Sequence, residues 1–306
     1  TQFNELPQGV KFLVDMRAEL LRLRQGHPNL RPLEADLKRL LSAWFDVGLL
    51  QMQEINWRSS AALLEKLIAY EAVHAIQSWN DLKNRLDSDR RCFAFFHPNM
   101  PEEPLIFVEV ALVKGMATNV QTLLDEAAPL EDIRLADTAI FYSISNAQQG
   151  LSGISFGNFL IKRVVKKLQQ EFPQLTQFAT LSPMPGFCRW LDKIDTAQES
   201  ALLDEGVTSR SPTHLQKLAV HYLSQQKQKR NQNYARDPVA HFHLSNGAQI
   251  ERLNWMGDTS DNGLKQSAGM MVNYLYELPH IENRSQGYSA EGKVSLSVSI
   301  DKLLNK

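Results

Sequence analysis

Two short segments carry side chains that could take part in acid–base or nucleophilic chemistry. Ser182 lies in LSPMPGF, directly after a run typical of a strand, while His241 and His243 lie in AHFHLSNG. A serine hydroxyl can act as a nucleophile, and a histidine can transfer protons near neutral pH or bind a metal. These three side chains are the first candidates for a reactive site.

Each candidate also has an ordinary structural explanation. Ser182 stands before Pro183, and a serine before a helix-opening proline is a common N-cap, which the residue pattern alone favours. There is no G-x-S-x-G elbow, so a serine hydrolase is disfavoured. The pattern predicts strand, turn and strand over residues 241–258, with both histidines on one face. No third ligand accompanies them, which disfavours a metal site.

A third segment has the composition of an anion-binding loop. Residues 141–169 predict a strand, a loop containing Gly150, Gly153 and Gly157, and an amphipathic basic helix. Unpaired N–H groups and the helix dipole can bind a phosphate in such a loop. The spacing is neither that of a P-loop nor that of a Rossmann fingerprint, which disfavours ATP and NAD. A glycine loop can equally be a packing turn, so both interpretations stay open.

The elements that would position these segments form a helical part and an α/β part. Apolar residues at helical spacing predict that the first ninety residues are mainly helical. The pattern that follows is β-β-β-loop-α-β, with the glycine loop at the carboxyl end of a strand, where such sheets bind ligands. The predicted elements are helices over residues 10–23, 33–45, 59–73 and 157–172, and strands over residues 90–98, 104–113, 137–145 and 175–182.

Length and charge restrict the function classes. The chain has 306 residues, enough for about two domains. Its 33 basic and 34 acidic residues give a net charge of −1, which disfavours nucleic acid or a membrane surface as a partner. Two cysteines without metal-ligand spacing disfavour a disulfide scaffold and a zinc site, and favour a reducing compartment. No apolar run approaches the ~20 residues of a spanning helix.

Two long stretches together resemble the malonyl-CoA decarboxylase family. They are residues 141–187 and residues 237–258, and the resemblance extends to HPNMPEEPLIFVEVAL and AGMMVNYLY. It implies an α+β fold, with an N-terminal all-helical domain, here shorter than in the family, before a catalytic domain resembling the Gcn5-related N-acetyltransferases. We expect the helical domain over residues 1–89 and the catalytic domain over residues 90–306. The anion at the glycine loop would then be the phosphate-bearing part of coenzyme A.

The resemblance also assigns roles to individual residues. The family's catalytic serine corresponds to Ser182 and its catalytic histidine to His243, which leaves His241 as a neighbour. Tyr276 is a further candidate for the substrate site, although it could be an ordinary strand aromatic. The malonyl-CoA loop corresponds to Gln149, Gly150, Ser152, Gly153, Ile154, Ser155, Phe156, Gly157 and Asn158.

The implied reaction is decarboxylation of malonyl-CoA to acetyl-CoA and CO2 through a thioester enolate. The thioester is its own electron sink, so no cofactor or metal is expected. We expect His243, with a pKa near the operating pH, to protonate the new carbanion while Ser182 orients it. One alternative is a CoA-dependent acyltransferase, which would need a base near the thioester. The other is a non-catalytic acyl-CoA-binding module, which would tolerate loss of Ser182 or His243.

Partners and location follow from the same resemblance. We expect malonyl-CoA and acetyl-CoA as partners, no nucleic acid or membrane, and a homo-oligomer, dimer or tetramer, assembled through the helical domain. The short segment between Gly186 and Asp237 favours a bacterial-type, cytoplasmic enzyme of fatty-acid or malonate metabolism. An organellar location stays open, because the chain begins at Thr1 without a methionine.

Overall fold

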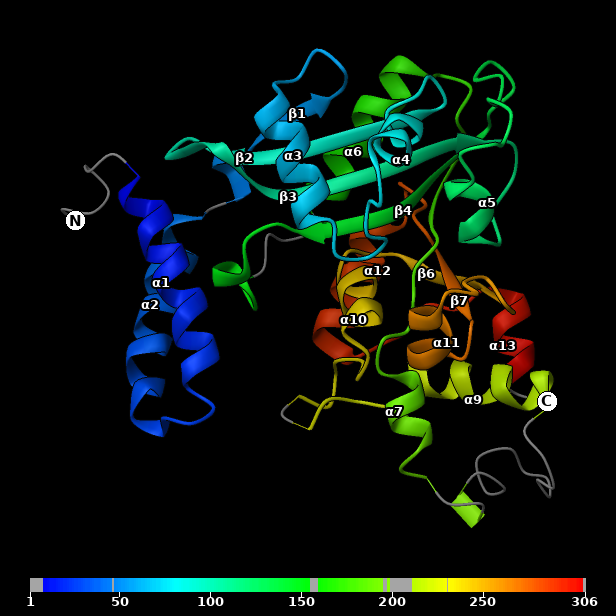
Figure 1. The fold of residues 1–306 in the computed structure, drawn as a ribbon. Helices are drawn as coiled ribbons and strands as arrows, with labels where there is room; N and C mark the ends of the chain where they lie inside the picture. The colour runs from blue at the N-terminus through cyan, green and yellow to red at the C-terminus, as the bar shows by residue number, and fades with distance from the viewer. Residues whose placement is uncertain are drawn as a thin grey trace. The chain divides into compact units, whose positions relative to one another are not determined.

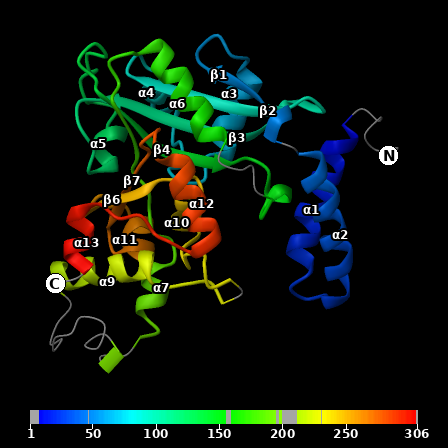
Figure 2. The same cartoon turned by 180° about the vertical axis from the view of Figure 1, so that it is seen from behind.

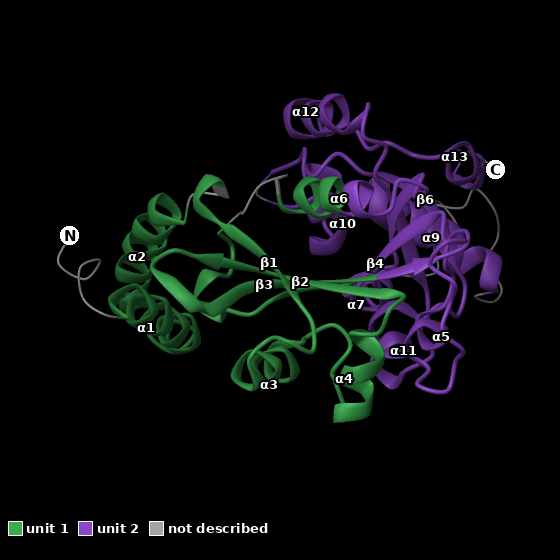
Figure 3. Cartoon of the chain, turned by 90° about the horizontal axis from the view of Figure 1, so that it is seen from above, with its two compact units in different colours: residues 1–110, 143–167 green, residues 111–142, 168–306 purple. Residues whose placement is uncertain are grey.

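A computed structural model gives the fold of most of the chain. The residues that it describes are 8–45, 47–154, 159–194, 197–198, 211–229 and 231–304. They form two compact units, coloured separately in Figure 3. Unit 1 comprises residues 1–110 and 143–167, and unit 2 comprises residues 111–142 and 168–306.

Unit 1 begins with a pair of helices. Helices α1 (Gly9–Leu23) and α2 (Arg31–Trp44) lie side by side in both views (Figures 1 and 2), joined through the short 3-10 helix η2 (Pro28–Leu30). The apolar spacing predicted both helices. Pro32 lies in the first turn of α2, where a proline suits a helix because its missing N–H would have had no intrahelical partner. Val10, Leu13 and Val14 are among the buried residues of α1.

A strand interrupts the predicted helical region. After the 3-10 helix η3 (Val47–Leu49), β1 (Gln51–Ile55) pairs antiparallel with β2 (Arg90–His97), from Gln51 opposite Phe96 to Ile55 opposite Cys92. Only Ile55 of β1 is fully buried. The strand is polar because it lies at one end of the strand order, so its sequence lacks the apolar alternation that predicts strands.

Two further helices of unit 1 pack against its strands. Helix α3 (Ala61–Tyr70) begins at the N-cap Ser60, and α4 (Trp79–Arg85) begins at the N-cap Ser78, each serine accepting a main-chain N–H hydrogen bond. A core of apolar side chains joins these helices to the strands and includes Leu64, Leu67, Leu82, Cys92, Phe96 and Phe107.

In the described residues the sheet has seven strands, in the order β1-β2-β3-β4-β5-β7-β6. Strands β3 (Met100–Val113) and β4 (Thr138–Asn146) each have residues in both units. Strand β4 runs parallel to β5 (Gln177–Thr180), from Thr138 opposite Gln177 to Phe141 opposite Thr180. Between them the chain forms the 3-10 turn η4 (Gln149–Leu151) and helix α6 (Phe159–Glu171). The predicted strand-loop-helix-strand order is therefore confirmed.

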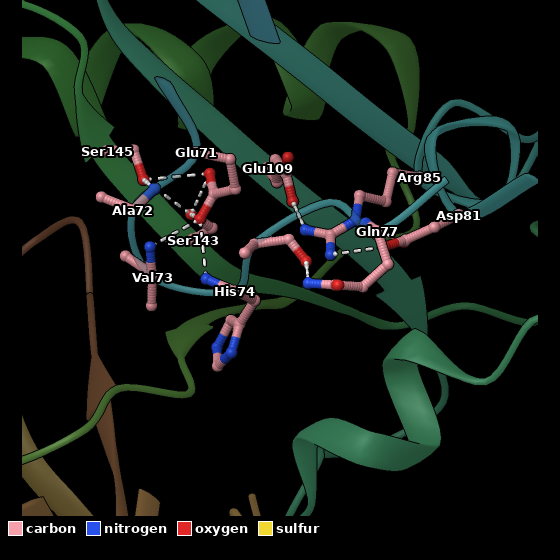
Figure 4. A network of polar contacts seen from close by, with 11 residues as sticks. Glu71, Ala72, Val73, His74, Gln77, Asp81, Arg85, Glu109, Ser143 and Ser145 are labelled. Atoms are coloured by element: carbon pink, nitrogen blue, oxygen red, sulfur yellow. Dashed lines mark hydrogen bonds and ion pairs between the residues drawn. The ribbon is translucent and has the colours of Figure 1, made fainter. Parts of the chain in front are cut away.

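A buried carboxylate attaches the chain after α3 to β4 (Figure 4). Glu71 accepts hydrogen bonds from Ser143 Oγ, 2.8 Å from each carboxylate oxygen, and from Ser145 Oγ at 2.9 Å. The N–H groups of Val73 and His74 donate to the same carboxylate at 2.8 and 2.9 Å. Because β4 leads directly into η4, this attachment fixes the strand that precedes the glycine loop.

A second buried polar group of unit 1 centres on Arg85. Its Nε donates to Asp81 Oδ1 at 2.8 Å and its Nη1 to Glu109 Oε2 at 3.0 Å (Figure 4). The Arg85 and Glu109 side chains are 2% and 0% exposed, so this ion pair lies in the interior. It joins α4 to the middle of β3.

Unit 2 holds the remaining strands and most of the remaining helices. Strands β6 (Gln249–Asn254) and β7 (Met271–Leu275) pair antiparallel, and β7 also pairs with β5. Its core includes Val120, Leu123, Ile140, Ala179, Leu181 and Met271. The described helices are α5 (Val120–Leu124), α7 (Phe187–Leu191), α9 (Pro212–Ser224), α10 (Pro238–Ser245), α11 (Asp261–Ser267), α12 (Ile281–Glu291) and α13 (Val298–Leu304).

One predicted element is wrong. Residues 241–245, predicted to begin a strand, belong to helix α10, and only the second half of that prediction is a strand, β6. Asp237 caps the helix by accepting hydrogen bonds from Val239 N and Ala240 N, and Pro238 occupies its first position. This Asp-Pro pair is a helix-start signal that outweighs the short alternation in AHFHL.

The predicted α+β class is confirmed, with a helical N-terminal region followed by a mixed sheet whose central β4-loop-α6-β5 order is the one expected. The boundary between residues 89 and 90 stays a prediction. Among the described residues, no helix combines the length and the apolar character needed to cross a membrane.

Candidate active site

Ser182 lies in unit 2, just beyond the end of β5. Its main chain forms a bridge with β7, in which Ser182 N donates to Val272 O at 2.9 Å and Val272 N donates to Ser182 O at 2.8 Å. The next helix, α7, has Gly186 as its N-cap residue. The N-cap interpretation of Ser182 is therefore wrong, and its side chain is free of that structural task.

His243 reaches the site from helix α10, whose first turn is fixed by the buried Asp237. Oδ2 of Asp237 accepts hydrogen bonds from Gly186 N at 3.3 Å and Tyr222 Oη at 3.2 Å, in addition to the two helix N–H groups at Oδ1. Burial raises the pKa of Asp237 against the opposing effect of these donors. The carboxyl thus joins the loop after Ser182 to the start of the helix that carries His243.

Gly186 is required by this close packing. A Cβ at Gly186 would lie 2.2 Å from Tyr222 Oη, the hydroxyl that donates to Asp237. A larger residue would therefore displace the tyrosine that helps to hold the helix cap. The glycine after Pro185 has a packing role at the site rather than a turn-forming one, since its φ of −104° is open to any residue.

A line of neutral hydrogen-bonding groups meets at the imidazole of His243. Ser182 Oγ lies 3.1 Å from Nε2, and Tyr276 Oη lies 2.8 Å from Nδ1. Ser182 Oγ also donates to Thr180 Oγ1 at 2.9 Å. A hydroxyl has one proton, so a serine that donates to Thr180 must accept from Nε2–H. A neutral imidazole protonated at Nε2 then accepts at Nδ1 from the Tyr276 hydroxyl.

Burial dominates the electrostatics of the site. His243 is 3% exposed, and loss of solvent lowers its pKa to about 3. The expected pKa near the operating pH therefore does not hold for the protein without a ligand, in which the ring is neutral. The same burial raises the pKa of Tyr276 well above its ordinary value, so its hydroxyl keeps its proton.

Tyr274 and Tyr276 hold the imidazole in different ways. The Tyr274 ring stacks on His243 with centroids 4.5 Å apart and an interplanar angle of 25°. Tyr276, just after β7, is fixed by a hydrogen bond from its N–H to Phe178 O at 2.8 Å, and its ring meets the imidazole edge-on. The Tyr274 hydroxyl has no hydrogen-bond partner among the described residues.

His241 has a separate environment. Residues two apart on a helix are about 200° apart around its axis, so the predicted shared face of the two histidines is wrong. His241 Nδ1 lies 3.0 Å from Tyr288 Oη, and its ring packs 4.5 Å from that of Tyr234. Within the described residues, no three histidine, cysteine or acidic side chains gather as metal ligands.

The described part of the predicted substrate loop lies in unit 1. Gln149, Ser152 and Gly153 are exposed, whereas Gly150 and Ile154 are buried. Gly153 has a φ of +72°, a left-handed conformation that suits glycine. The other predicted loop residues, Ser155, Phe156, Gly157 and Asn158, lie outside the described residues.

Sequence reasoning missed Thr180 and Tyr274. Thr180 accepts from Ser182 and also from Tyr274 N at 3.2 Å, so it fixes where the serine hydroxyl points. Alternation gave a usable signal, because Thr180 and Ser182 are two apart at the end of a strand, as are Tyr274 and Tyr276. Residues two apart on a strand share a face.

Sequence models of one family cover almost the whole chain. Residues 1–45 match the malonyl-CoA decarboxylase N-terminal domain, and residues 48–306 match the malonyl-CoA decarboxylase C-terminal domain. The chain belongs to the malonyl-CoA decarboxylase family. Helices α1 and α2 therefore correspond to the family's N-terminal domain, and both Ser182 and His243 lie in its C-terminal domain.

Individual family members agree. Malonyl-CoA decarboxylase from Rhodopseudomonas palustris superposes with a TM-score of 0.90 at 43% identity, covering 98% of this chain and 77% of the other. The protein from Cupriavidus metallidurans gives 0.85 at 47% identity, covering 96% and 78%. Mitochondrial malonyl-CoA decarboxylase from Mus musculus is 38% identical over 97% of this chain, and that from Anser anser anser is 37% identical over 96%. The chain spans 66 to 68% of the length of these vertebrate relatives.

Proposed function

We propose that this chain decarboxylates malonyl-CoA to acetyl-CoA and CO2, with Ser182 and His243 as its catalytic residues. The observation that carries the proposal is the hydrogen-bonded pair of Ser182 Oγ and His243 Nε2, 3.1 Å apart and buried, in a member of the malonyl-CoA decarboxylase family. An acyltransferase acting on an amine would need a base near the thioester. Burial lowers the pKa of His243 to about 3, which makes its imidazole a weak base and suits a reaction that begins without proton abstraction.

The first step of the reaction requires stabilisation of the negative charge that develops on the thioester oxygen. The bond between the malonyl carboxylate and the methylene carbon breaks, CO2 leaves, and the electron pair forms a thioester enolate. A donor aimed at the enolate oxygen typically contributes about 3 kcal/mol. We propose that Ser182 supplies a hydroxyl for the malonyl group, while Thr180 limits the directions in which that hydroxyl can point.

The second step needs a proton, because conversion of the malonyl carboxylate to acetyl-CoA and CO2 consumes one. A carboxylate near an imidazole favours the charged ring and opposes the effect of burial on its pKa. We propose that malonyl-CoA binding raises the pKa of His243 from about 3, so that the ring takes up a proton with the substrate. Because Nε2 already carries a hydrogen, the proton taken up goes to Nδ1, where Tyr276 Oη then accepts a hydrogen bond, and the Nε2 proton is the one that His243 delivers to the α-carbon of the enolate.

Tyr276 belongs to the proposed catalytic group of unit 2, and the glycine loop of unit 1 is proposed in its own right as the acyl-CoA loop. Tyr276 fixes the ring tautomer through Nδ1, which places the exchangeable proton at Nε2. Gln149, Gly150, Ser152, Gly153 and Ile154, with Ser155 to Asn158 outside the described residues, are proposed as the acyl-CoA loop. Their glycines and main-chain amides suit an anionic ligand.

The test is release of CO2 and acetyl-CoA from malonyl-CoA by the purified chain, beside His243→Ala and Ser182→Ala. We expect product from the parent and a fall in kcat of about 10²-fold or more in both variants, the usual scale for loss of an acid–base group. His241→Ala is the matched control, since it removes an imidazole from the same helix that contacts Tyr288 instead.

Either of two results would overturn the assignment. A His243→Ala variant that keeps parental kcat removes the proton-donor role. A parent that binds malonyl-CoA yet releases no CO2 means that the chain is an acyl-CoA-binding module. Full activity in His241→Ala is required for the loss at position 243 to be specific.

Two further proposals rest on family membership. We infer a homo-oligomer, dimer or tetramer, assembled through α1 and α2, which light scattering of the purified chain would test. We also infer a cytoplasmic location, which the bacterial origin of the solved relatives supports, although the vertebrate relatives are named as mitochondrial. A monomer at micromolar concentration would contradict the first proposal.

A further inference from the structure

A buried arginine of helix α1 contacts the main chain of the glycine loop. Arg17 Nη1 donates to Gly150 O at 2.5 Å, and Nη2 donates to Ser152 O at 2.9 Å. Both contacts lie within unit 1. The Arg17 side chain is 2% exposed; its hydrogen bond to Gly150 O is buried, and the one to Ser152 O is partly buried.

Helix α2 holds this guanidinium in place. Arg17 Nε donates to Glu34 Oε1 at 3.0 Å, and Nη2 lies 2.8 Å from the same oxygen. Arg24 Nη1 lies 2.8 Å from Glu34 Oε2, and in the described part of the chain Arg24 forms no hydrogen bond or ion pair with the loop. Burial alone would raise the pKa of Glu34, but the two arginines outweigh it and hold that pKa below its ordinary value. Glu34 is therefore an anion that orients Arg17.

Close packing supports the same contact. A Cβ on Gly150 would lie 1.8 Å from Val14 O of α1, so only glycine lets the loop approach the helix this closely. Packing against α1 is therefore enough to explain why residue 150 is a glycine, without a ligand. The loop thus rests on α1 through both main-chain packing and two hydrogen bonds.

Peptide geometry gives this contact a consequence for ligand binding. In a trans peptide the C=O of one residue and the N–H of the next point in opposite directions. Because Arg17 binds Ser152 O, the Gly153 N–H points away from Arg17, and Gly153 is exposed. Lys38 Nζ lies 3.4 Å from where a Cβ on Gly153 would stand, so the neighbouring charge suits an anion.

We propose that Arg17 is a positioning residue for acyl-CoA binding: α1 orients the Ser152–Gly153 peptide so that its N–H can donate to the ligand. The proposal rests on the proposed function, because it assumes that this loop binds malonyl-CoA. Arg17 touches no substrate and acts through the loop, so its loss should weaken binding and leave the chemical step unchanged.

The experiment compares Arg17→Gln with Arg24→Gln in the full chain. For each, kcat and KM for malonyl-CoA and the Kd for acetyl-CoA are measured. A hydrogen bond from a charged donor is worth about 1.5–3 kcal/mol, so we expect KM and Kd to rise about tenfold or more in Arg17→Gln. We expect kcat within about threefold of the parent, since an interaction lost equally from ground and transition states leaves kcat unchanged. Arg24→Gln should keep both constants.

A double variant tests whether the effect of Arg17→Gln comes only from loss of protein stability. Arg17→Gln leaves the buried Glu34 carboxylate with Arg24 as its remaining ion-pair partner, so we expect this variant to be less stable than the parent. Arg17→Gln/Glu34→Gln removes both charges, and should fold while still showing the raised KM and Kd. If the folded double variant keeps parental KM and Kd, or loses kcat instead, Arg17 is a structural residue and the proposal fails.

The binding arm separates this proposal from the proposed function. A parent that binds acetyl-CoA without decarboxylating malonyl-CoA would refute the decarboxylase, while the effect of Arg17→Gln on Kd would still decide the positioning role. Parental activity together with an unchanged Kd in the folded double variant would refute the positioning role alone.

Discussion

The interior of unit 1 and the immediate surroundings of His243 in unit 2 contain different kinds of polar group. In unit 1, buried ion pairs attach helices to neighbouring elements. Arg17 pairs with Glu34, and Arg85 pairs with Asp81 and Glu109. At the candidate active site of unit 2, hydroxyls surround a neutral imidazole, and His243 has no ion pair with an acidic residue in the described part of the chain. The two regions are equally dry but differ in charge.

The difference reflects what each region must do. Buried ion pairs are costly to desolvate and give directional, charge-assisted contacts, which suits the attachment of helices and loops. A neutral site leaves an incoming carboxylate as the main local charge, so that charge can alter the protonation of its surroundings. The buried ion pairs that attach helices and loops thus lie in a different unit from the neutral groups around His243.

The largest expected effect is on stability in unit 1. Arg85→Met leaves Asp81 and Glu109 without their buried partner, and we expect a loss of about 3–5 kcal/mol in the free energy of unfolding. Urea unfolding would measure it. Arg134→Met, which breaks an exposed pair with Asp132, is the control and should leave stability nearly unchanged, because solvent screens an exposed pair. An equal loss in the free energy of unfolding in both variants would mean that the buried ion pair stabilises the protein no more than the exposed pair does.

The second expected effect separates two tyrosines in unit 2. Tyr276→Phe removes the partner of His243 Nδ1, and we expect a fall in kcat of about tenfold or more, because one buried hydrogen bond is worth about 1–3 kcal/mol. Tyr274→Phe keeps the stacked ring and removes only a hydroxyl without a described partner, so kcat should change little. Similar kinetics for both variants would contradict tautomer control by Tyr276.

The smallest expected effect distinguishes the two regions by pH. The folded-state pKa of His243, about 3, lies below its unfolded value near 6.5, so the unfolded chain binds the extra proton. Over the single unit between pH 6 and 5, stability should fall by up to about 1.4 kcal/mol. Glu34, whose pKa is also lowered, should act only below about pH 4.5.

The measurement is urea unfolding at several pH values for the parent and His243→Gln. The difference between their stabilities should change with pH between 6 and 5, where Glu34 is ionised in both states. A parallel dependence in the two proteins over that interval would show that His243 is not held neutral by burial.

Local pattern predicted most elements, and its failures have physical causes. Local pattern misses strand β1 because this outer strand buries only Ile55. It predicts a strand at α10 because AHFHL alternates, although Asp237-Pro238 is a helix-start signal. The N-cap interpretation of Ser182 is wrong because the next helix, α7, begins only at Phe187 and has Gly186 as its N-cap residue, while Ser182 pairs with β7. Each error reflects a tertiary contact or a cap that outweighed a short pattern.

The candidate site was less predictable than the fold. Ser182 and His243 were selected by family resemblance, since nothing in their local sequence brings together side chains 61 residues apart. Thr180 and Tyr274 could have been found by strand alternation once their neighbours were known. Arg17 gave no signal, because its partners, Gly150 and Ser152, are main-chain atoms that any sequence supplies.

The seating of Gly150 on Val14 also limits how such chains can be recombined. Arg17 and Gly150 are 133 residues apart, yet the helix and the loop fit with no room for a single added methyl group. A chimaera that took its first helices from one relative and its sheet from another would have to preserve the close contact between Gly150 and the main chain of Val14. The opening helices and the glycine loop are therefore expected to be inherited together, as one module divided along the chain.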